Sequence, residues 1–178
     1  SIVTMLIISR EVVVKIKKHG WNVYPLEAFG FLMGDVDRAC IDACLPVSKS
    51  QRWYVNDERW TRLEEKLQVA QNFAFQYEKS IVGVYIASDV LMNAEPGINA
   101  WMKENELCLL HYNLQCCEQC SLIRAIIDAD GQIIDHRDIA QGIRLNNEFN
   151  QKRVLQNWFK TIGYLDYSNG SLENINKS

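Results

Sequence analysis

The cysteines of this chain are spaced in a way that could build a metal site. Cys117 and Cys120 form a CxxC pair with Cys116 beside it, and Cys40 and Cys44 form a looser second pair. Two such pairs of thiolates commonly hold a structural zinc ion. If the two segments lie close together, Cys40, Cys44, Cys117 and Cys120 could bind zinc. Ordinary reduced thiols are the alternative to a zinc site. A redox role is less favoured, because a redox CxxC needs a helix N-terminus and strands are expected on both sides of this one.

Carboxylates and a histidine provide a second set of groups that could do chemistry. Glu27, Asp89 and Glu95 could together bind magnesium or calcium, which prefer oxygen ligands. A catalytic thiol in the CxxC pair would instead need a base such as His111. A hydrolase or peptidase with a relocated metal or thiol site is therefore one function class that the residues leave open.

The three histidines differ in their surroundings along the sequence. His111 stands inside an apolar run, which is typical of a core histidine with a hydrogen-bond partner. His19 and His136 stand near the ends of expected elements. We therefore expect these two to face solvent.

Composition limits the class of protein. The chain has 178 residues, 48% hydrophobic and 23% charged, which suits one globular domain. Its formal net charge of −3 gives no electrostatic reason to expect nucleic acid as a partner. The first residues are apolar but lack the charge order of a secretory signal, and no apolar run is long enough to span a membrane. We therefore expect a cytoplasmic protein with reduced thiols and no membrane partner.

Hydrophobic periodicity predicts an α+β domain with a single mixed sheet and flanking helices. Residues 1–145 would form this domain, and residues 146–178 a C-terminal helix and polar tail. Gly20 is expected to end the first helix. Alternation in "ACIDACLPV" would place Cys40 and Cys44 on the same face of a strand. The predicted order is a strand at 5–9, a helix from Ser9, strands near 27–35 and 39–47, a long helix at about 57–79, a strand at 80–88, a short helix from Pro96, three more strands and a helix at 146–162.

Two segments carry a resemblance to a known family. They are "YPLEAFGFLMG" at 24–34 and "VGVYIASDVLMNAEPGINAW" at 82–101. Both are similar to segments of the JAMM family of zinc isopeptidases, also called JAB or MPN, and the likeness runs from about Thr4 to Ile139. The resemblance implies a JAB/MPN-like fold, a cytidine-deaminase-like sandwich. It also places Glu27 where the family keeps its catalytic glutamate.

The metal ligands of that family are missing here. Its two histidine positions fall on Ile86 and Ser88, and its aspartate position falls on Ala100. Isoleucine and alanine have no lone pair to offer zinc, and a serine hydroxyl is a poor ligand at neutral pH. The resemblance therefore implies an inactive relative that needs no cofactor, in which Glu27 is vestigial.

An inactive member of this family is expected to work by binding. The resemblance implies a scaffold that pairs with another MPN-type domain or holds a ubiquitin-like protein or peptide, and a homodimer is an alternative. Two surfaces could serve. One is an apolar groove at the former metal site, and the other is the C-terminal helix, whose tryptophan and phenylalanine resemble interface anchors. The predicted binding residues are Ile86, Leu91, Met92, Trp158 and Phe159.

Overall fold

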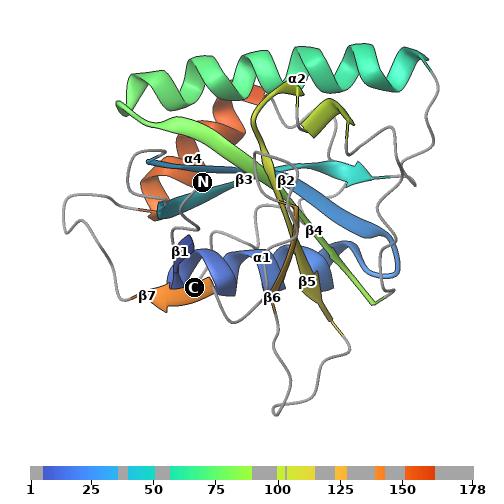
Figure 1. The fold of residues 1–178 in the computed structure, drawn as a ribbon, viewed down its shortest axis with the longest axis vertical. Coiled ribbons are helices and arrows are strands. Elements are labelled where there is room, and N and C mark those ends of the chain that lie inside the picture. Colours follow the sequence, from blue (N-terminus) through green and yellow to red (C-terminus); the bar gives the residue numbers. More distant parts are fainter. Residues whose placement is uncertain are drawn as a thin grey trace.

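The computed structural model describes residues 6–35, 40–50, 57–89, 100–102, 104–114, 123–127, 139–142 and 151–162. Within these ranges the chain forms one mixed β-sheet with flanking helices, as the sequence predicts (Figure 1). The elements are β1 (Leu6–Ser9), α1 (Arg10–Val23), β2 (Glu27–Asp35), β3 (Cys40–Ser50), α2 (Asp57–Gln76), β4 (Ser80–Ser88), β5 (Cys108–Asn113), β6 (Ile123–Ile127), β7 (Ile139–Gly142) and α4 (Gln151–Ile162). No helix in the described part of the chain is long and apolar enough to cross a membrane.

Within the described residues, the sheet has seven strands in the order β6-β5-β4-β2-β3-β1-β7. Strands β2, β3 and β4 form its antiparallel centre, whereas β5 runs parallel to β4. At the far edge, β1 is parallel to both β3 and β7. Strand β7 therefore pairs with β1, at the opposite edge of the sheet from β6.

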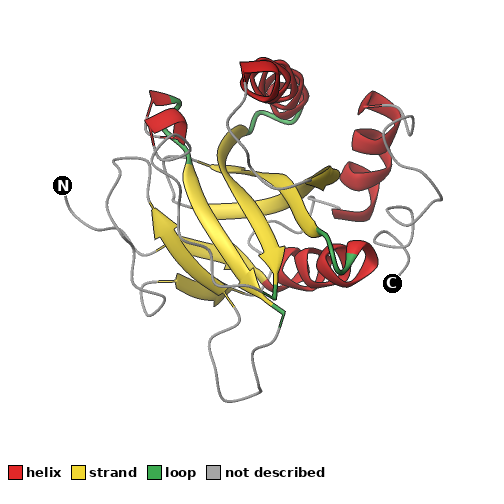
Figure 2. Cartoon of the chain, turned by 90° about the vertical axis from the view of Figure 1, so that its right-hand side faces the viewer, coloured by secondary structure: helices red, strands yellow, loops and turns green. Residues whose placement is uncertain are grey.

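Helices cover both faces of the central strands. Helix α1 packs on one face, and α2 and α4 pack on the other. Figure 1 shows α2 and α1 on opposite sides of the sheet, and Figure 2 shows the sheet curving between them. Because both faces are covered, β2 is buried along nearly its whole length, which explains its continuous apolar run.

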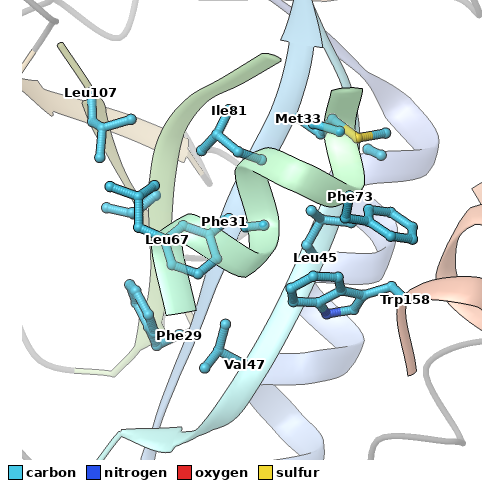
Figure 3. Packing of buried hydrophobic residues seen from close by; sticks show 14 of the residues in the cluster. Phe29, Phe31, Met33, Leu45, Val47, Leu67, Phe73, Ile81, Leu107 and Trp158 are labelled. Atoms are coloured by element: carbon cyan, nitrogen blue, oxygen red, sulfur yellow. The ribbon is translucent and has the colours of Figure 1, made fainter. Parts of the chain in front are cut away.

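The larger core lies between the sheet and the pair of helices α2 and α4 (Figure 3). Helix α2 contributes buried residues at spacings of three and four, which form one apolar face of an α-helix. They are Leu63, Leu67, Ala70, Phe73 and Ala74. The smaller core lies under α1 and holds Val12, Val13 and Ile16 together with residues of β1, β2, β3, β4 and β5.

Gly20 does not end α1, contrary to expectation, because the helix continues to Val23. The glycine faces the sheet instead. A Cβ added there would lie 2.8 Å from Leu114 Cδ2 and 2.9 Å from Ala87 Cβ. The absence of a side chain lets α1 approach β4 closely, so Gly20 is a packing residue rather than a helix terminator.

Candidate functional site

Three polar residues meet at one end of the central strands. Glu27 begins β2, Ser88 ends β4 and His111 lies in the neighbouring strand β5. The register pairs Ala28 with Ala87, and Ile86 with His111, so the three residues are neighbours across the sheet.

Alternation along the strands places these three side chains on the same face. Phe29, Ile86 and Leu109 all belong to the core beneath α2. Glu27, Ser88 and His111 each stand two positions from one of these residues, and residues two apart in a strand share a face. The cluster therefore lies at the end of the larger core.

Ser88 and His111 form a buried hydrogen-bonded pair. Ser88 Oγ lies 2.9 Å from His111 Nε2, and the two residues are only 3% and 2% exposed. The expectation that His111 is a core histidine with a partner is confirmed. A serine hydroxyl next to an imidazole nitrogen is also the arrangement that activates a nucleophile, although here the pair lies beneath the surface.

Apolar side chains fill the space beside this pair. Ile86 is fully buried, and Trp101 and Met102 belong to the same core. The Trp101 indole donates a 2.6 Å hydrogen bond to the Glu64 carboxylate, which ties the short helical segment at 100–102 to α2. Ile86 is thus a core residue, and the prediction that it lines an open groove is wrong.

The predicted metal positions do not assemble a metal site among the described residues. Ala100 is exposed at the start of its helical segment. Within the described ranges, no group of three or more histidine, cysteine, aspartate or glutamate side chains could hold a metal ion. Of the three carboxylates proposed for a hard cation, Glu27 and Asp89 are half-buried at this end of the sheet, and Glu95 lies outside the described residues.

Asp89 contacts the loop that follows α1. Its carboxylate accepts a hydrogen bond from the Tyr24 hydroxyl, and this bond and the nearby negative charge raise the pKa of Tyr24. The tyrosine ring itself is about half exposed, at 47%. This contact joins the end of β4 to the segment that connects α1 with β2.

The prediction that Cys40 and Cys44 share a face is wrong. Met33 pairs with Ala43 and Gly34 pairs with Ile41, so Asp42 is an extra residue in β3. Such a bulge interrupts the alternation of side chains. Cys44 therefore packs under α1 together with Ile41, whereas Ala43 faces the other core. The remaining members of the predicted zinc site, Cys117 and Cys120, lie outside the described residues.

Trp158 and Phe159 are each only 1% exposed, so the prediction that they are exposed anchors is wrong. Helix α4 packs its aromatic face onto the sheet. The Trp158 indole donates a 2.7 Å hydrogen bond to the Pro46 carbonyl. Its ring also packs edge-on against Phe73, with 5.2 Å between the ring centroids. The other two predicted binding residues, Leu91 and Met92, lie outside the described part of the chain.

His19 is fully buried, although its place near a helix end suggested exposure. Its Nδ1 lies 2.7 Å from the Tyr85 hydroxyl, while its Nε2 is buried without a hydrogen-bond partner. Burial lowers the pKa of His19 to about 3, so the ring is neutral at physiological pH. Periodicity could have located it, because Ile16, His19 and Val23 recur at helical spacing along the buried face of α1.

The described part of the chain defines an α+β domain with one seven-stranded mixed sheet and a buried serine–histidine pair. No family model matches the sequence, and no curated protein matches it. Among solved structures, the chain is similar to that of protein DSY2949 from Desulfitobacterium hafniense, with 16% identity and a TM-score of 0.53. The match covers 81% of this chain and 97% of that one. At this identity the likeness shows the fold alone.

Proposed function

We propose that this chain is a catalytically inactive relative of the JAMM/MPN zinc isopeptidases and that it acts as a protein-binding or scaffold module. One observation carries the proposal. The two strand positions at which the family would hold zinc are occupied by Ile86, packed in the core, and by Ser88, hydrogen-bonded to His111. Glu27, at the family's glutamate position, directly precedes Ala28, which pairs with Ala87, the residue before Ser88.

The chemistry of these side chains supports the loss of hydrolysis. In the family, zinc lowers the pKa of the attacking water from about 15.7 toward about 7. A half-buried carboxylate at Glu27 cannot produce that effect by itself. The hydrogen bond between Ser88 and His111 satisfies two polar groups that would otherwise be costly to bury beside Ile86.

The partner class follows from the same resemblance. We propose a second MPN-type domain or a ubiquitin-like protein as partner, with self-association as the alternative. The buried aromatics of α4 are not available as anchors, since they hold the helix on its own sheet. The binding surface therefore has to be sought elsewhere on the chain.

Restoring the ligands tests the alignment behind the proposal. The triple variant Ile86→His, Ser88→His, Ala100→Asp would recreate the family's donor set, and we expect it to bind about one more zinc ion per chain than the parent protein. Isothermal titration with zinc on both proteins, each also carrying Cys117→Ser and Cys120→Ser to remove the predicted cysteine site, measures the difference. Equal binding by two folded proteins would contradict the alignment. If the triple variant does not fold, zinc bound by the parent protein with these two serines would contradict it independently.

A serine hydrolase is the second candidate, and the 2.9 Å contact between Ser88 Oγ and His111 Nε2 favours it. A fluorophosphonate probe would label an activated serine at this position. The proposal of an inactive module predicts no labelling above that of a Ser88→Ala variant. Labelling that disappears in this variant would establish the hydrolase instead.

A further inference from the structure

Exposed large hydrophobic side chains concentrate at one place in the described structure. Six such residues are more than a third exposed, and three of them fall within six positions, at Trp21, Tyr24 and Leu26. Val14, Val69 and Phe75 are the others. Isolated exposed hydrophobic residues are ordinary, whereas a cluster of them with an aromatic pair is characteristic of a binding surface.

The cluster is held in a defined geometry. The rings of Trp21 and Tyr24 lie 5.3 Å apart between centroids, tilted by 46°. The turn between α1 and β2 is fixed by a 2.9 Å hydrogen bond from Leu26 N to the Val23 carbonyl. The Tyr24 hydroxyl is anchored on Asp89. An aromatic pair ordered in this way loses little conformational freedom when a ligand binds.

A negative charge stands at the edge of this aromatic pair. Asp89 directly follows β4, and its carboxylate accepts a hydrogen bond from the Tyr24 hydroxyl in the segment after α1. Asp89 is half-buried, so salt screens its charge less than a fully exposed charge. An electron-rich indole face together with a carboxylate is complementary to a cation.

We propose that Trp21, Tyr24 and Asp89 form a recognition site for an arginine side chain presented by a partner protein, with Leu26 contacting an apolar neighbour of that arginine. Arginine fits better than lysine because its planar guanidinium stacks on an aromatic face while its N–H groups reach a carboxylate. The site supplies the binding surface that the proposed scaffold function lacks, and to that extent it rests on that function.

Two nearby charges oppose this binding. Lys17 and Lys18 lie four and three positions before Trp21 on α1, and Lys17 is the more exposed of the two. Their positive charges repel an incoming guanidinium. The Lys17→Gln substitution should therefore tighten binding about twofold, the size expected for one exposed charge.

The test uses the full chain and a labelled peptide, Gly-Ser-Leu-Arg-Ser-Gly. A matched peptide carries citrulline, which keeps the shape of arginine but not its charge. Fluorescence anisotropy should show saturable binding of the arginine peptide with a Kd of about 0.1–1 mM, as befits a single side chain. The citrulline peptide should bind at least about tenfold more weakly, as should the arginine peptide to Trp21→Ala or Asp89→Asn.

Phe75→Ala is the matched control, since Phe75 is an exposed aromatic on a different element with 82% exposure. It should leave the Kd unchanged. Equal affinity for the citrulline peptide, no saturable binding, or an equal loss in Phe75→Ala would overturn the proposal. These outcomes are distinct from failure of the proposed function, because zinc binding by the protein carrying Cys117→Ser and Cys120→Ser reports on the positions Ile86, Ser88 and Ala100.

Discussion

Acidification should destabilise this protein through a single buried histidine. His19 is fully buried on α1, and burial lowers its pKa from 6.5 to about 3. In the unfolded chain the ring regains its ordinary pKa and takes up a proton below about pH 6.5. The unfolded state therefore binds more protons than the folded state between about pH 6.5 and pH 3. Stability contributed by the neutral buried ring is lost as the pH falls through this window.

The size of the effect follows from these two pKa values. Between pH 7 and pH 5 the unfolded state gains about 0.7 proton at this site, while the folded state gains almost none. The free energy of unfolding should fall by about 2 kcal/mol over this range because of His19 alone. Most carboxylates titrate below pH 5, which is why the comparison stops there.

Urea unfolding at pH 7 and pH 5 measures how far the free energy of unfolding falls with pH in the wild type and in His19→Gln. Glutamine retains a group that can hydrogen-bond to Tyr85 but does not titrate. The decrease in the free energy of unfolding between pH 7 and pH 5 should therefore be about 2 kcal/mol smaller in the variant. Tyr85→Phe is the control, because it removes the 2.7 Å hydrogen bond and keeps the histidine, so its decrease should resemble that of the wild type. A decrease in His19→Gln equal to that of the wild type would refute the reasoning.

Three further predictions concern buried residues. Gly30→Ala should lower the free energy of unfolding by about 1–3 kcal/mol, because the new methyl group would clash with the Tyr85 ring. In a double-mutant cycle measured by urea unfolding, the cost of Gly30→Ala should be smaller in the background of Tyr85→Leu. Trp158→Phe should lose about 2 kcal/mol in the same assay through its indole hydrogen bond and lost volume, and an unchanged midpoint would contradict its burial. Cys44 should resist iodoacetamide at pH 8 in the folded protein and react in urea, because burial raises its pKa to about 12, and mass spectrometry would detect any early modification.

Local patterns in the sequence predict most of the fold. The apolar face of α2 recurs at helical spacing, and the continuous apolar run of β2 requires cover on both sides, so element type and burial can be derived from nearby residues. The pairing of β7 with β1 depends on residues far apart in the chain. Periodicity within a single segment carries no information about such pairing.

The errors at the site have the same origin. The bulge at Asp42 is set by how β3 pairs with β2, and this shift moves Cys44 away from the predicted face. Trp158 looked available for a partner because its own helix has a broad apolar face, but the Pro46 carbonyl and Phe73 that receive it come from distant elements. The pairing of Ser88 with His111 likewise needs the parallel register of β4 and β5, which no motif in the sequence specifies.

The most direct test of the central claim is the zinc content of a variant purified without chelator in which Cys117→Ser and Cys120→Ser remove the predicted cysteine site. The proposal predicts no zinc in this folded variant, because Ile86 and Ala100 have no lone pair to offer zinc and the Ser88 hydroxyl is a poor ligand. About one zinc ion per chain in the variant would contradict the proposal, because the metal would then be held without that cysteine pair.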